Sequence, residues 1–169
     1  MKSAFPGLLL AIVVLCAAPE RANASRYWSS PGAGCVPDDD AIQNNRYITS
    51  SASLLFRSGQ TGQFAALCPI AGANSGASNP SHFYVSFNNS VLTDSSNHVT
   101  GTLWRKSFGG TLTLIATSGG TGYSANNWTL DTSFTHTFNF DSYYYYVSLD
   151  ISRGNSAYTM TFRGASIGS

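Results

Sequence analysis

Charged side chains are scarce in this sequence. Only 10% of its 169 residues are Asp, Glu, Lys or Arg, the formal net charge is +1, and Glu20 is the only glutamate. Proteins that bind duplex nucleic acid normally carry a basic surplus that contacts the phosphates. We therefore expect no nucleic-acid partner, and we expect hydroxyl and amide side chains to supply most of the polar surface.

Patterns that mark catalytic or metal-binding sites are also lacking. G-x-S-x-G occurs once, at 164–168, but a hydrolase nucleophile elbow needs acid and histidine partners later in the chain, and only Ser169 follows. The three histidines lie far apart and show no metal-ligand spacing: His82, His98 and His136. We expect no catalytic residue, no metal ligand and no cofactor. This favours a non-enzymatic protein, with a hydrolase as a remote alternative.

Carboxylates are concentrated in one short run, Asp38-Asp39-Asp40. Such a run could bind Ca²⁺, but the alternating ligands, central glycine and terminal glutamate of an EF-hand loop are absent. Aspartates at the start of a helix accept hydrogen bonds from its free N–H groups and suit its dipole. We therefore predict that this run caps one helical turn within 37–44.

The first residues have the layout of a secretory signal. Lys2 precedes an apolar run from Leu8 to Ala18, and Ala22-Asn23-Ala24 forms a small-x-small site before Ser25. We predict a signal peptide over 1–24 and cleavage after Ala24. The apolar run is too short for a stop-transfer helix, so no membrane span is expected after cleavage. The expected location is secreted or periplasmic.

Cysteine occurs only three times, as Cys16, Cys35 and Cys68. Cleavage of the signal would remove Cys16 and leave an even pair. Two thiols in an oxidising compartment pair more often than they stay free, and these two lack a metal-like C-x-x-C spacing. We predict one disulfide between Cys35 and Cys68, which should stabilise the fold by about 3 to 4 kcal/mol.

The rest of the chain alternates apolar and polar residues over short stretches, as strands with one buried face do. We predict a hairpin of 46–57 with 64–70, closed at Gln60-Thr61-Gly62, and a second of 98–107 with 111–117, closed at Gly109-Gly110. Further strands are expected at 82–88, 134–140, 143–151 and 158–162. About eight strands without a long amphipathic helix indicate a single antiparallel β-sandwich over 25–169, jelly-roll-like or immunoglobulin-like; a closed barrel is the alternative.

Five short motifs form a framework around the cysteines: Cys35-Val36-Pro37, Ile42-Gln43, Arg46-Tyr47, Thr61-Gly62 and Cys68-Pro69-Ile70. This framework resembles a group of small secreted bacterial proteins that has no assigned activity. The tyrosine-rich stretch from Tyr143 to Ile151, with a polar turn and a final strand after it, is similar to their C-terminal halves. The resemblance implies an exported bacterial protein with one disulfide.

Aromatic residues carry the remaining functional signal. On the strand expected at 143–151, Tyr144, Tyr146 and Asp150 lie on the face opposite the apolar residues, and Trp104 could join them, as could Tyr123 and Trp128. Exposed aromatics beside hydroxyls and a carboxylate can stack on sugar rings and mark interaction sites. Alternatively, these tyrosines pack only in cross-strand pairs.

Two function classes follow from these observations. The first is an exported ligand-binding module that uses Tyr144, Tyr146, Asp150 and Trp104 to bind a glycan or another surface protein. The second is a structural or assembly subunit of the cell surface or matrix, because an edge strand can pair with a strand of another chain and this sequence offers few charges to prevent it.

Overall fold

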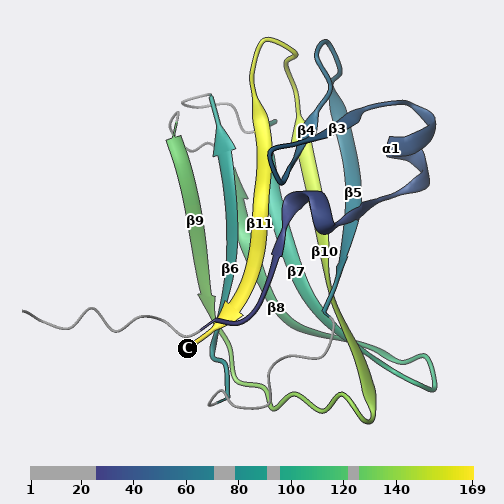
Figure 1. The fold of residues 1–169 in the computed structure, drawn as a ribbon, viewed down its shortest axis with the longest axis vertical. Helices are drawn as coiled ribbons and strands as arrows, with labels where there is room; N and C mark the ends of the chain where they lie inside the picture. Colours follow the sequence, from purple (N-terminus) through teal and green to yellow (C-terminus); the bar gives the residue numbers. More distant parts are fainter. Residues whose placement is uncertain (1–25, 71–78, 91–95, 122–125) are drawn as a thin grey trace, which may run out of the picture.

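The computed structural model describes residues 26–70, 79–90, 96–121 and 126–169, which form two antiparallel sheets packed face to face (Figure 1). The six-stranded sheet has the order β3-β4-β11-β6-β9, with β1 also pairing with β11. Its strands are β1 (Arg26–Pro31), β3 (Tyr47–Ser50), β4 (Ser53–Phe56), β6 (His82–Asn89), β9 (Asn126–Ser133) and β11 (Met160–Gly168). The predicted β-sandwich is therefore confirmed.

The five-stranded sheet has the order β2-β5-β10-β7-β8. Its strands are β2 (Val36–Pro37), β5 (Gly62–Pro69), β7 (His98–Ser107), β8 (Leu112–Thr121) and β10 (Tyr143–Arg153). A short 3₁₀ turn, η1 (Gly32–Gly34), and one helical turn, α1 (Asp39–Gln43), connect the first strands. Asp38 Oδ1 accepts a hydrogen bond of 2.9 Å from the Ala41 N–H, so the predicted helix cap is confirmed for this residue. In the described ranges, no helix is long and apolar enough to span a bilayer.

The core lies between the two sheets and is built by the predicted alternation. Phe83, Val85 and Phe87 of β6 are buried against the inner residues of β10, Val147, Leu149 and Ile151 among them. The sheets approach closely at Gly101 of β7, where a Cβ atom would lie only 2.6 Å from Val85 Cγ2. Any larger residue at this position would push the sheets apart, because packed interiors have little free volume.

The predicted disulfide is confirmed. Cys35 and Cys68 are bonded, both are buried, and the bond joins the segment before β2 to strand β5 across a sequence separation of 33 residues. It ties the N-terminal segment to the centre of the sandwich.

The stretch 46–57, predicted as one strand, is instead the hairpin of β3 and β4. Ser50 pairs with Ser53, and Ser51 and Ala52 take positive φ angles of 48° and 64°. Two successive left-handed residues make a tight turn that matches the twist of a hairpin. No glycine or asparagine marks this turn in the sequence, which is why alternation alone missed it. This split, together with β1, β2 and β9, which the alternation did not predict, raises the strand number above the predicted eight.

The predicted hairpin closed at Gln60-Thr61-Gly62 is also wrong. Strand β4 belongs to the six-stranded sheet and β5 to the five-stranded sheet, so the chain crosses between the sheets here. A second crossing follows Arg153, because β10 and β11 are the central strands of different sheets. Alternation shows which face of a strand is buried but does not show which neighbour it pairs with.

Buried Arg153 links the two crossings. Its Nη2 donates hydrogen bonds to the backbone oxygens of Arg57 and Gln60, and Nη1 donates to the Tyr158 oxygen at 3.2 Å. The guanidinium lies 4.9 Å from the centroid of the Phe56 ring, and only 4% of the residue is exposed. One side chain therefore holds the 57–60 and 153–158 connections together.

The predicted strand over 134–140 is an extended segment without strand pairing. Its alternation is real, since Phe134, His136, Phe138 and Phe140 are half-buried and the residues between them are exposed. The last three of these rings contact the ring of Tyr145, whose hydroxyl accepts a hydrogen bond of 3.0 Å from the Asn139 N–H. The segment leads from one sheet to the other, so it covers the end of the core instead of extending either sheet.

Replacing Arg153 tests how much the crossings depend on it. We expect Arg153→Met to lower the free energy of unfolding by about 2 kcal/mol or more, because three hydrogen bonds from one buried charged group to the backbone are lost. Urea unfolding measures the change. Arg57→Met, at an exposed position in the same connection, is the control and should change stability by less than about 0.5 kcal/mol. Equal effects of the two changes would contradict the assigned role.

His136 should make stability depend on pH. Burial lowers the pKa of His136, and the positive charge of Arg105 lowers it further. Below about pH 6.5 the unfolded chain therefore binds a proton at this residue before the folded chain does, so stability falls as the pH falls until the folded pKa is passed. We expect His136→Gln to flatten this dependence in urea unfolding curves at pH 7 and pH 5. The exposed Thr137→Val should leave the slope unchanged, and an unaltered slope in His136→Gln would refute this assignment.

Candidate functional site

The candidate site is the outer face of the five-stranded sheet. Residues directly opposite each other in an antiparallel pair project to the same face. Tyr146 of β10 pairs with Pro69 of β5 on one side and with Trp104 of β7 on the other, and Trp104 pairs with Leu114 of β8. These four residues therefore form a row across the sheet, perpendicular to its strands.

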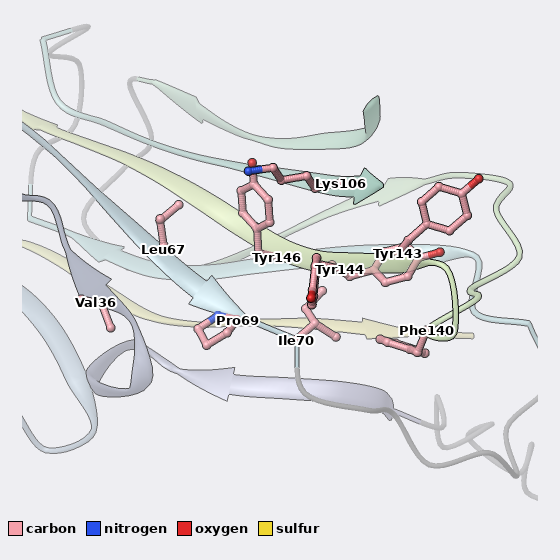
Figure 2. Close-up of a pocket in the computed structure, with 10 residues that line it drawn as sticks. Val36, Leu67, Pro69, Ile70, Lys106, Phe140, Tyr143, Tyr144 and Tyr146 are labelled. Carbon is pink, nitrogen blue, oxygen red and sulfur yellow. The ribbon is translucent and has the colours of Figure 1, made fainter. Parts of the chain in front are cut away.

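Parallel rows lie on both sides of this one. Towards the end of the sandwich, Tyr144 pairs with Lys106, which pairs with Leu112. In the opposite direction, Ser148 lies between Leu67 and Thr102, and Asp150 follows two residues along β10. Figure 2 shows Leu67, Tyr146 and Lys106 rising from three strands to the same side of the sheet.

Much of this face is apolar and exposed. Tyr144 is 63% exposed and its ring centroid lies 4.7 Å from that of Phe108, in the turn between β7 and β8. Large apolar side chains continue across all five strands, and we call this set the apolar band: Val36, Leu67, Pro69, Tyr144, Tyr146, Trp104, Phe108, Leu112 and Leu114. An exposed apolar surface of this continuity is typical of an interaction site.

The band borders an open depression of about 700 Å³. Val36, Leu67, Pro69, Tyr144 and Tyr146 line it, and Figure 2 shows it next to Ile70 and Phe140. Lys106 supplies the charged group in this lining. The depression is thus a mostly apolar recess with tyrosine hydroxyls and one ammonium group.

Polar groups gather farther along the same face. Asp150 Oδ2 accepts a hydrogen bond of 2.7 Å from Gln63 Nε2, and Asp150 Oδ1 lies 3.3 Å from His98 Nε2. Trp104 Nε1 donates to Ser148 Oγ at 2.8 Å, which fixes the indole beside this cluster. The side chain of Asp150 stays 42% exposed, so its carboxylate can accept further hydrogen bonds from a ligand.

The structure brings all four predicted site residues to this one face, Tyr144, Tyr146, Asp150 and Trp104, although their role in binding stays a prediction. Trp128 does not join them, because it lies on β9 in the other sheet and packs against the core. Tyr123 lies outside the described residues. The alternative of tyrosines used only for cross-strand packing does not fit Tyr144, which is largely exposed.

Sequence reasoning missed several residues of the face. Leu112 and Leu114 follow the Gly109-Gly110 turn at alternate positions, so the register of that hairpin could have placed them beside Trp104. Gln63 and His98 could not be found in this way, because their approach to Asp150 depends on which strands flank β10.

Other candidate groups are dispersed. His82 Nδ1 contacts Asp131 Oδ1 at 2.8 Å in the six-stranded sheet, while His136 Nε2 lies 3.2 Å from the Tyr145 hydroxyl. Ser166, the central residue of the G-x-S-x-G pattern, is buried within β11 and not at a strand-to-helix turn. Across the described ranges, three or more His, Cys, Asp or Glu side chains do not gather where a metal ion could bind.

No protein-family model and no curated protein matches the chain. Among solved structures, carbohydrate-binding module CBM36 in complex with calcium and xylotriose is similar over 83% of this chain and 99% of its own, with 9% identity and a TM-score of 0.46. The CBM36-1 domain of a multidomain xylanase from the hindgut metagenome of Trinervitermes trinervoides is similar over 84% and 96%, with 10% identity and a TM-score of 0.42.

Proposed function

We propose that the protein is an exported, non-enzymatic binding module that binds a glycan on the outer face of its five-stranded sheet. The observation that carries this proposal is the register of β10 with β7. It places Tyr144, Tyr146 and Trp104 beside one another on an exposed face that also holds Asp150. Export rests on the signal-like N-terminus and agrees with the disulfide, a bond that persists in oxidising compartments.

A glycan matches the two chemistries of this face. A pyranose ring presents an apolar C–H surface that can pack on an aromatic ring, and its hydroxyls need donors and acceptors at the ring edge. Tyr144, Tyr146 and Trp104 supply the packing surface. Asp150, Gln63 and His98 supply the acceptor and donors. Because Gln63 and His98 already contact Asp150, the polar cluster is ordered before a ligand arrives, which lowers the entropic cost of binding.

The exposed aliphatic residues favour a second candidate, a protein partner. Val36 and Leu67 are 62% and 51% exposed, and aliphatic side chains without nearby polar groups contribute little to binding a sugar hydroxyl. They would add apolar area to a protein interface, whose core is typically apolar and rich in aromatic residues. The two candidates share the tyrosines and differ in whether Val36 and Leu67 contribute.

Binding to a panel of plant, fungal and bacterial polysaccharides tests the proposal. A ligand of the folded state raises the melting temperature, and titration calorimetry of the oligosaccharides that do so gives their affinities. We expect Tyr144→Ala and Tyr146→Ala each to weaken binding by about tenfold or more, which corresponds to about 1.4 kcal/mol. Asp150→Asn should weaken it through the lost carboxylate.

Tyr84→Ala is the matched control, since Tyr84 lies on the six-stranded sheet and is not part of the face. It should leave the affinity unchanged. A glycan that binds the Tyr144→Ala, Tyr146→Ala double variant as tightly as the parent protein would refute this face as its site. If Val36→Ser and Leu67→Ser weaken binding to a protein while no polysaccharide binds, the protein partner replaces the glycan.

A further inference from the structure

Strand β8 is an open edge of the five-stranded sheet. Among the described strands it pairs only with β7. The Ser107 N–H donates to the Thr111 oxygen at 2.9 Å and closes the hairpin. Because hydrogen-bonded and non-hydrogen-bonded pairs alternate along an antiparallel ladder, Thr113 exchanges bonds with Arg105, while the N–H and C=O groups of Leu112 and Leu114 point away from β7. These backbone groups form a template for another strand.

The start of this edge, Leu112 to Leu114, lacks the usual protection against such pairing. Exposed edge strands are generally guarded by charged side chains, proline or bulges. Residues 107–130 contain no Asp, Glu, Lys, Arg, His or Pro. The pairing irregularity between Leu103 and Trp104 skips Ile115 of β8, so Leu112, Thr113 and Leu114 keep regular pairing before it. The hairpin of β7 and β8 also extends beyond the body of the sandwich, at the lower right of Figure 1, and Leu112 and Leu114 on its β8 side are exposed.

We propose that β8 pairs with β8 of a second copy of this chain, antiparallel and around a two-fold axis. The proposal goes beyond glycan binding, and it names β8 as the edge strand through which the predicted assembly role would act. A strand related to itself by a two-fold axis perpendicular to it is automatically antiparallel, so the Leu112 and Leu114 backbone groups meet complementary groups. The absence of charge over 107–130 means that no like charges face each other across this pair.

Pairing would also join the apolar bands of the two copies. Leu112 and Leu114 are 48% and 53% exposed, and both belong to the outer face. In the paired state they lie next to the same residues of the second copy, which reduces their contact with water. The outer faces then form one continuous surface, and two adjacent sites on it can bind one extended polymer with higher avidity than a single site.

A membrane is the competing occupant of this hairpin, since Phe108, Leu112 and Leu114 are apolar and Lys106 is nearby. Insertion into lipid would leave the outward backbone groups of β8 without hydrogen-bond partners, which is strongly unfavourable in a hydrocarbon environment. Pairing with a second strand satisfies the same groups. The open ladder therefore favours a second copy over a bilayer.

Sedimentation velocity of the oxidised protein over a wide concentration series tests the proposal. We expect a reversible monomer–dimer equilibrium. Leu114→Lys should weaken it by about tenfold or more, because it places two like charges across the pair. Leu114→Pro should do the same, because it removes an outward N–H at an edge position where proline is tolerated. Leu112→Lys serves as a further variant if either of these fails to fold, as checked by circular dichroism and melting.

Leu67→Lys is the matched control, because Leu67 belongs to the same face and is 51% exposed but lies on β5, away from this edge. It should dimerise like the parent. Hydrogen exchange gives an independent readout, since the Leu112 and Leu114 amides should exchange more slowly as the protein concentration rises. A protein that stays monomeric, a Leu67→Lys effect as large as that of Leu114→Lys, unprotected amides in the dimer, or vesicle binding without self-association would each overturn the proposal.

Discussion

The arrangement of the sandwich depends on two consecutive strands that enter different sheets. Strand β10 is central in one sheet and β11 in the other, so the chain must cross the core edge between them. Buried Arg153 stabilises this crossing because its guanidinium binds carbonyls of both the 57–60 and the 153–158 connections. Carbonyl groups in such crossings have no ladder partners, and a buried carbonyl without a donor is costly. The Arg153 side chain thus supplies hydrogen-bond donors in connections where no neighbouring strand is present.

The central position of β10 explains the candidate site. Its inner residues fill the core, and its outer residues therefore form a row with neighbours on both sides. Tyr146 lies between Pro69 and Trp104 because β5 and β7 flank the same strand. A strand at an edge would offer only one such neighbour. The position of Tyr146 beside Trp104 and the polar cluster around Asp150 therefore follow from the order of the strands in the sheet. Core packing on the opposite face holds these strands in place.

The low charge of the chain affects both proposed interactions. Hydroxyl and amide side chains supply most of the polar surface, and the outer face carries one ammonium, Lys106, and one carboxylate, Asp150. Their charges balance, which suits a neutral ligand such as a glycan and gives little long-range steering. The same neutrality leaves β8 without the charges that normally prevent edge pairing. The scarcity of charged side chains therefore favours both proposed interactions, ligand binding on the face of the five-stranded sheet and self-association at its edge.

The sequence alone determined the sandwich class and which residues of β6, β7 and β10 are buried, because alternation is a property of each short stretch. It also determined the pairing of Cys35 with Cys68, because only these two cysteines remain outside the signal-like segment. It also placed Tyr144, Tyr146 and Asp150 on one face, since they lie on one strand. Only the tertiary structure decided that β4 and β5 belong to different sheets, that 134–140 covers the core end, and that Gln63, His98 and Leu114 share the face of Tyr146. The physical reason is that alternation fixes the side to which a residue points, whereas the neighbours of a strand depend on how the whole chain closes its core.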